Sequence, residues 1–180
     1  EQKGIDLLLR IMPDLHLHSQ PLQVVILGSG DHYLEQKLQR AAVQYTDMLK
    51  IKIGYDEALA HQIEAGADFF LMPSRFEPCG LNQLYSLRYG TLPIVHNTGG
   101  LADTVVHSTR QTLADRTATG IVFAPAEPLA LLNAINQALT LYLAPQSRQQ
   151  LITTAMQQDF SWTHSAQEYI QLYQRCLPNG

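Results

Sequence analysis

The chain has 180 residues, of which 46% are hydrophobic and 16% are charged, and its formal net charge at pH 7 is −4. A length of this order suits one compact domain, and the mild negative charge argues against a surface that binds nucleic acid or membrane. The apolar runs are much shorter than the ~20 residues of a membrane span, so we expect a globular protein. Its mild net charge suits neutral ligands such as sugars.

The first half of the chain alternates between two kinds of pattern. Apolar residues spaced three and four apart indicate helices, and short continuous apolar runs indicate strands that are covered on both faces. In chain order we expect helix 4–18, strand 23–27, helix 32–45, strand 49–53, helix 57–65, strand 69–72, helix 80–89 and strand 92–95. Strands that alternate with helices predict an α/β fold with a Rossmann-like, doubly wound parallel sheet.

The second half contains fewer strand patterns. The elements expected there are a short helix through 103–106, a strand over 120–123, helices that begin at Pro128 and Pro145, and a final helix after Ser161. The hydroxyl of Ser161 is placed to cap that final helix. Residues 108–119 are polar and without a pattern, so we interpret them as an exposed loop.

The most tightly turning polar stretch, residues 73–85, lies between an apolar strand and a helix. Pro78 fixes φ shortly before the helix, and Gly80 lets the backbone come close to a ligand. The first N–H groups of a helix lack intrahelical partners and attract anions, here near Gly80, Leu81 and Asn82. We therefore place the chemistry of the protein in this stretch.

Two other features have weaker functional interpretations. Gly28 and Gly30 form part of a dinucleotide fingerprint, but Tyr33 stands at its third glycine position, which favours a plain turn beside a ligand pocket. Cys79 and Cys176 lack the spacing of a metal site or a disulfide framework, which favours a reducing cytosol. We expect Cys79 to be a packed pocket wall rather than a nucleophile.

Residues 75–93 resemble the glycogen and starch synthases through the string R-F-E-P-C-G-L-N-Q-L-Y-S-L-R-Y-G-T-L-P. The resemblance continues in Gln2-Lys3-Gly4, Ile53-Gly54-Tyr55, Thr98-Gly99-Gly100-Leu101-Ala102-Asp103-Thr104-Val105 and Asp159-Phe160-Ser161-Trp162. It implies a GT-B glycosyltransferase, in which two Rossmann-like domains face each other across a cleft. Only the C-terminal, donor-binding domain is matched, so we expect this chain to be cut from a longer one and to be inactive alone.

The resemblance also implies roles for the matching residues. Glu77 would contact the glucose of the donor, and Lys3 would bring a positive charge to its diphosphate; these two are the predicted catalytic residues. Tyr55 would stack on adenine, and Tyr85 would lie near the ribose. The other residues expected to bind the donor are Ser74, Arg75, Cys79, Gly80, Leu81, Asn82, Thr98, Gly99 and Gly100.

Some of these positions keep a second interpretation. Asn82 replaces a threonine that is usual in the synthases, which leaves the phosphate contact open, and Tyr85 replaces a second glutamate, which narrows the resemblance to the synthase branch. Glu77 could instead be a charge at a helix start, favoured by the helix dipole. Tyr55 could be a half-buried residue at a strand end.

The implied reaction is retaining transfer of glucose from ADP-glucose to the non-reducing end of an α-1,4-glucan, without a metal or another cofactor. Residues 1–160 would be the donor-binding domain, and 161–180 a helix that crosses back to the N-terminal domain. That domain would hold the glucan acceptor, and we expect no nucleic-acid or membrane partner. The expected compartment is the cytoplasm, or a plastid in a plant or alga.

Two other function classes stay open at this point. A sugar-nucleotide epimerase can be built on the same fold, and a nucleotide-sugar binding module needs no catalysis at all. The preference for ADP-glucose over UDP-glucose rests only on the string R-F-E-P-C-G-L.

Overall fold

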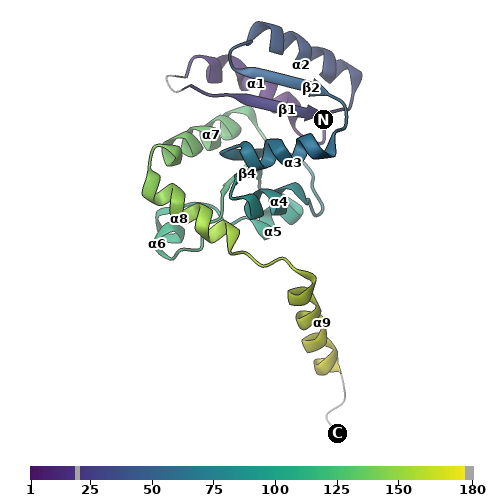
Figure 1. Cartoon of the computed structure of the whole chain (residues 1–180), viewed down its shortest axis with the longest axis vertical. Coiled ribbons are helices and arrows are strands. Elements are labelled where there is room, and N and C mark those ends of the chain that lie inside the picture. The colour runs from purple at the N-terminus through teal and green to yellow at the C-terminus, as the bar shows by residue number, and fades with distance from the viewer. Residues whose placement is uncertain (19–20, 177–180) are drawn as a thin grey trace.

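The computed structural model describes residues 1–18 and 21–176, and Figure 1 shows their arrangement. In chain order the elements are α1 Ile5–His16, β1 Val24–Gly28, α2 His32–Gln44, β2 Leu49–Ile53, α3 Glu57–Gly66, β3 Phe69–Met72, α4 Asn82–Tyr89, β4 Leu92–His96, α5 Gly99–Thr104, α6 Arg110–Ala114, β5 Ile121–Phe123, α7 Pro128–Tyr142, α8 Pro145–Met156 and α9 Trp162–Cys176. The predicted alternation of strands and helices is confirmed. Pro13 lies inside α1, which ends three residues later.

All paired strands run parallel, and they form two sheets. One sheet has the order β1-β2, with Val24 opposite Leu49, and the other has the order β3-β4-β5. Within the described residues no ladder joins β1 to β3, so each of these strands is paired along one edge only. Because β3 and β4 pair in parallel, their carboxyl ends lie at the same edge of the second sheet, where open α/β folds bind ligands.

One large core joins the two sheets through helices. The helices α1 and α7 pack against each other, and Leu7, Ile11 and Leu131 are among the side chains they bury almost completely. Strand residues Leu49 and Leu92 belong to the same cluster. Each such side chain contributes about 1.5–3 kcal/mol relative to an exposed one, so this packing holds the site-bearing sheet in place.

Two interpretations of the sequence are wrong in detail. Strand β1 is only half buried, with Val25 53% exposed, so it is not covered on both faces. Residues 108–119 are not an exposed loop: they contain α6, whose start is a capping box between Thr109 and Thr112. Ser108 and Thr119 are buried at its two sides. Hydrogen bonds of polar side chains start this helix, and none of its residues is buried. The segment therefore lacks the apolar pattern by which a helix is recognised in a sequence.

The turn after β4 also differs from its prediction. Gly99 and Gly100 belong to the first turn of α5, whereas Val105 and Val106 lie beyond its end. This shift matters for the site, because a glycine-rich helix start can approach another backbone closely.

The last helix, α9, projects away from the body of the protein (Figure 1). None of its residues is buried, and its apolar residues Tyr169, Leu172 and Tyr173 are all more than half exposed. The predicted cap is present, since the Ser161 hydroxyl accepts a hydrogen bond from the N–H of His164 at 3.4 Å. Residues 177–180 of the predicted C-terminal helix lie outside the described residues.

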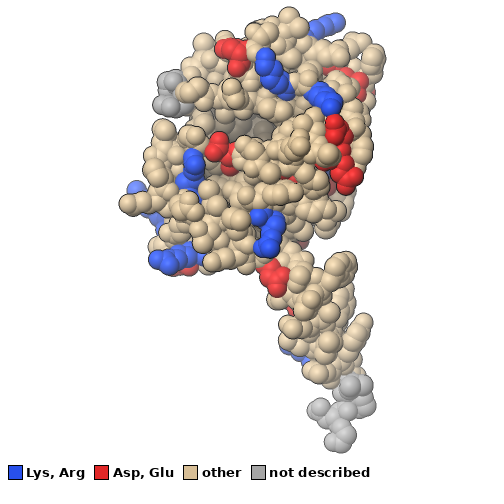
Figure 2. All heavy atoms as spheres, viewed as in Figure 1, with Lys and Arg blue, Asp and Glu red and all other residues tan. Residues whose placement is uncertain are grey.

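On the face shown in Figure 2, basic and acidic side chains stand singly or in small groups among uncharged ones. No helix within residues 1–18 and 21–176 has the length and hydropathy that crossing a membrane requires.

Candidate functional site

The candidate site begins where β3 ends, because the first residues of the chain lie against the loop that follows this strand. The N–H of Arg75 donates to the carbonyl of Gln2 at 2.9 Å. Gly4 has a φ of 68°, and a Cβ there would lie 2.0 Å from the carbonyl oxygen of Pro73. Only glycine fits such a close approach. Lys3 is therefore held beside residues that are about seventy positions away in sequence.

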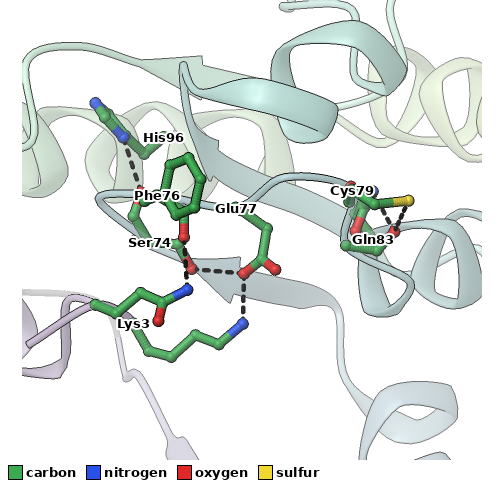
Figure 3. A network of polar contacts seen from close by, with 9 residues as sticks. Lys3, Ser74, Phe76, Glu77, Cys79, Gln83 and His96 are labelled. Atoms are coloured by element: carbon green, nitrogen blue, oxygen red, sulfur yellow. Dashed lines mark hydrogen bonds and ion pairs between the residues drawn. The ribbon is translucent and has the colours of Figure 1, made fainter.

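Glu77 is the acidic residue of this loop, and two side chains converge on it (Figure 3). Its Oε2 accepts hydrogen bonds from Lys3 Nζ at 2.5 Å and from Ser74 Oγ at 3.2 Å. The Glu77 side chain is 10% exposed and that of Lys3 is 61% exposed, so the ammonium group faces solvent while the carboxylate lies beneath it. The observed partners of Glu77 are thus side chains, rather than the start of a helix.

This arrangement has defined chemical uses. A buried carboxylate stabilises positive charge that develops on a bound molecule, and a lysine ammonium neutralises phosphate oxygens. Because the two charges also stabilise each other, removing Lys3 would leave the carboxylate of Glu77 buried without its ion-pair partner.

Ser74 lies behind Glu77 and not on the open surface. It is 1% exposed and donates its only hydroxyl proton to Glu77. Its carbonyl oxygen lies 2.8 Å from Nδ1 of His96 at the end of β4. Ser74, predicted to bind the donor, is therefore placed to orient Glu77, and β4 in turn supports Ser74.

Arg75 is engaged by the start of α1. Its guanidinium donates to both carboxylate oxygens of Asp6, each at 2.7 Å, and to the carbonyl of Glu1 at 2.8 Å. The hydrogen bond from Arg75 lowers the pKa of Asp6, and the same pair raises the pKa of Arg75. This ion pair ties α1, and with it Lys3, to the loop of Glu77.

We expect Asp6→Asn to destabilise the chain at pH 7 by about 1 kcal/mol or less, because the pair is partly exposed. The pKa of Asp6 is lowered in the folded state, so its contribution is complete above the unfolded value of 3.8 and is lost as the pH falls through the lower folded value. Urea unfolding at several pH values should show the difference from wild type shrinking below about pH 4. Asp14→Asn, at an exposed position, is the control. A difference that does not change with pH would contradict this account.

The second loop of the site, Thr98–Gly100, packs directly on the first. The N–H of Gly100 donates to the carbonyl of Glu77 at 3.1 Å. A Cβ on Gly99 would lie 2.2 Å from that same carbonyl oxygen, and one on Gly100 would lie 2.1 Å from the carbonyl oxygen of Cys79. The Thr98 hydroxyl reaches the carbonyl of Arg75 at 3.4 Å. These predicted residues thus support the backbone of the Glu77 loop.

The turn into α4 is held by a buried glutamine. Gln83 is fully buried, and its side-chain amide donates to the carbonyls of Cys79 and Gly80, both at 3.0 Å. Leu81, predicted to bind the donor, is 55% exposed, whereas Gln83 lies on the inner side of the helix start. Cys79, Leu81 and Asn82 are consequently all exposed where α4 begins.

Tyr55 lies two residues after the end of β2 and is 87% exposed, so the interpretation as a half-buried residue is wrong. The next residue, Asp56, caps α3 by accepting a hydrogen bond from the N–H of Leu59 at 3.0 Å. A hydrogen bond from Lys52, and then that N–H, lower the pKa of Asp56. The backbone beside Tyr55 is thereby anchored while its ring stays accessible.

Sequence reasoning missed several residues that shape the site. Tyr85 lies on α4 and is 41% exposed, and its ring contacts His61 from α3. The residues missed are Asp6, His61, Gln83 and His96. Only Gln83 carried a usable signal, its position three residues after Gly80 at a helix start; the others act through contacts between distant segments.

Comparisons with known proteins agree on one family. Residues 1–158 match the family model described as Glycosyl transferases group 1. The chain is 55% identical over 177 residues to glycogen synthase 1 of Methylococcus capsulatus. This match covers 98% of this chain and 36% of that protein. It is 51% identical over 175 residues to the glycogen synthase of Haemophilus influenzae Rd, covering 97% and 36% respectively.

One solved structure is similar over almost the whole chain. It is the catalytic domain of starch synthase IV from Arabidopsis thaliana bound to ADP and acarbose, with 34% identity and a TM-score of 0.82, and the match covers 97% of this chain and 36% of that one. The chain thus spans about a third of the length of the relatives it matches. These likenesses confirm the predicted resemblance and the α/β, GT-B type of fold.

Proposed function

Since this chain belongs to the group 1 glycosyl transferases, we propose that it is the donor-binding half of a retaining glucosyltransferase. This enzyme transfers glucose from ADP-glucose to the non-reducing end of an α-1,4-glucan. The observation that carries the proposal is the Lys3–Glu77 pair at the end of β3, built from residues 74 positions apart. The names of its relatives and the ADP in the similar starch synthase support the choice of substrates.

The two charges of the pair match the two charges of the reaction. As the bond between glucose and diphosphate breaks, positive charge develops at the anomeric carbon and negative charge on the leaving phosphate. Glu77 would stabilise the first and Lys3 the second, together with the N–H groups at the start of α4. Lys3 is the more exposed partner, so it can turn from Glu77 to a phosphate while Ser74 still holds the carboxylate.

The remaining roles in donor binding are assigned to the other predicted site residues. Tyr55 would stack on the adenine, and Tyr85 would lie beside the ribose. Cys79, Leu81 and Asn82 would line the pocket where α4 begins, and Arg75 and the Thr98–Gly100 turn would hold the shape of the loop. Each of these assignments can be tested by substituting that one residue and measuring donor binding.

The acceptor side would come from the rest of the longer protein. We propose that residues 1–160 form the donor domain and that α9 crosses to an N-terminal domain that holds the glucan. The exposed apolar residues of α9 support this, because such a face is normally covered by a partner. Two free cysteines, Cys79 and Cys176, support a reducing compartment such as the cytoplasm or a plastid.

The test uses the full-length protein with radiolabelled ADP-glucose and glycogen. A glucosyltransferase moves the label into the polymer, whereas an epimerase leaves it in a changed sugar nucleotide and a binding module leaves it unchanged. A parallel reaction with UDP-glucose decides the nucleotide. The isolated chain should bind ADP in calorimetry but transfer nothing, since half of the cleft is missing, and turnover by this chain alone would overturn the division of labour.

Tyr55→Ala should weaken ADP binding by ~1–3 kcal/mol, the scale of base stacking on an aromatic side chain. Isothermal titration of the isolated chain with ADP measures this change directly. Tyr142→Ala, which removes another partly exposed tyrosine at the end of α7, is the control and should leave ADP affinity unchanged. Equal affinities of the Tyr55 variant and wild type would remove Tyr55 from the donor site.

A further inference from the structure

We propose that His61 is a positioning residue for Tyr85 and thereby determines the affinity of the protein for its donor. The inference rests on the proposed function, which puts Tyr85 beside the ribose of the sugar nucleotide. His61 itself lies on α3, outside every motif that the family resemblance covers.

His61 contacts two tyrosines that are one helical turn apart on α4. Its ring lies 5.5 Å from that of Tyr85, at an interplanar angle of 56°. Its Nδ1 lies 3.2 Å from the hydroxyl of Tyr89. The imidazole and the Tyr89 ring also meet edge-on, with their centroids 6.1 Å apart. Tyr89 therefore holds the imidazole through its hydroxyl, and the imidazole supports the ring of Tyr85.

This support matters because Tyr85 is 41% exposed and has no other ring contact among the described residues. A tyrosine that is half in solvent loses rotamer freedom when it binds a ligand, and a neighbour that restricts it beforehand lowers that cost. Tilted aromatic pairs at this distance contribute beyond the area they bury. His61 thus holds the Tyr85 ring in place before the donor arrives.

The helix α3 also begins close to Tyr55, the residue proposed to stack on adenine. The cap of α3 is Asp56, the residue after Tyr55, and His61 follows the first turn of the helix. Because α3 packs against α4, it connects the base-stacking residue to the ribose-side residue. The ring of His61 is one contact through which α3 reaches Tyr85.

Contacts other than those of His61 also hold α3 in place. The hydroxyl of Thr91, the residue before β4, shares its proton between the carbonyls of Glu64 and Ala67, at 2.5 and 3.1 Å. Glu64 is itself buried, and burial raises its pKa. These anchors lie at the C-terminal end of α3, about one turn beyond His61, so removal of the imidazole should leave the helix folded.

The experiment compares variants of the full-length protein in the glucan-labelling reaction and in calorimetry with ADP. His61→Ala should raise KM for ADP-glucose about three- to tenfold, with kcat within about twofold and KM for glucan unchanged. Tyr89→Phe, which removes only the hydroxyl, should cause a smaller rise. His61→Phe, which keeps an aromatic ring against Tyr85, should resemble Tyr89→Phe. The control is Gln62→Ala, an exposed neighbour on α3.

A double-mutant cycle makes the test specific to Tyr85. If His61 acts through this ring, then adding His61→Ala to Tyr85→Ala causes no further rise in KM. Additive effects of the two substitutions would overturn the proposal, as would a His61→Ala protein with normal KM. A His61→Ala protein in which kcat, glucan affinity and melting temperature all fall together would show a merely structural role for His61. That result would also overturn the proposal.

The outcome for the proposed function is read separately. Absence of label in the polymer with the wild-type protein contradicts the glucosyltransferase but leaves the ADP titration as the measure of His61. A wild-type protein that transfers glucose, with His61→Ala indistinguishable from it, contradicts only the role of His61.

Discussion

Glu77→Gln in the full-length protein is expected to lower kcat for glucose transfer about 100-fold or more, on the order of 3 kcal/mol, with a much smaller change in ADP affinity. Glutamine keeps the shape of the side chain and can still accept the hydrogen bond from Ser74. It loses the negative charge that would favour an anomeric centre turning positive, and it leaves Lys3 without its ion-pair partner. Only interactions that are stronger in the transition state than in the ground state appear in kcat.

Turnover and melting temperature should be measured on the same preparation. Glu127→Gln is the control, because Glu127 is exposed at the start of α7 and makes no capping hydrogen bond there. Ser74→Ala gives the intermediate case, since the charge remains while its orienting hydroxyl is gone. Normal kcat in a destabilised Glu77→Gln protein would remove Glu77 from the site and return it to a structural role.

Gly100→Ala is expected to have the largest effect on stability, about 3 kcal/mol or more. The added Cβ would lie 2.1 Å from the carbonyl oxygen and 2.6 Å from the Cα of Cys79, and both atoms are backbone. The collision is relieved only if the turn of Cys79 and Gly80 moves away from α5. Because that turn opens α4, we also expect donor binding to weaken.

Gly66→Ala is the matched control, since Gly66 is also helical and a Cβ there would meet no atom within 4 Å. Alanine favours a helix over glycine by up to about 1 kcal/mol, so this variant should be neutral or slightly stabilised. Urea unfolding of both variants measures the contrast. A Gly100→Ala protein as stable as wild type would mean that the two loops are not packed as closely as described.

The sequence alone determined the element types and their order. Apolar periodicity and continuous apolar runs depend on neighbours three or four positions away, or on burial of both strand faces, and these are local properties of the chain. For the same reason Ser161 was recognised as a cap. The pattern was insufficient at α6, where a capping box of two threonines starts a short helix without an apolar stripe.

The tertiary structure alone decided which residues meet. Lys3 reaches Glu77 because Gly4 fits against Pro73 and Asp6 clamps Arg75, and no spacing in the sequence encodes those contacts. Likewise only the packing of α3 on α4 brings His61 to Tyr85. The physical reason is that side chains far apart in sequence acquire a defined distance only when the core fixes both elements that carry them.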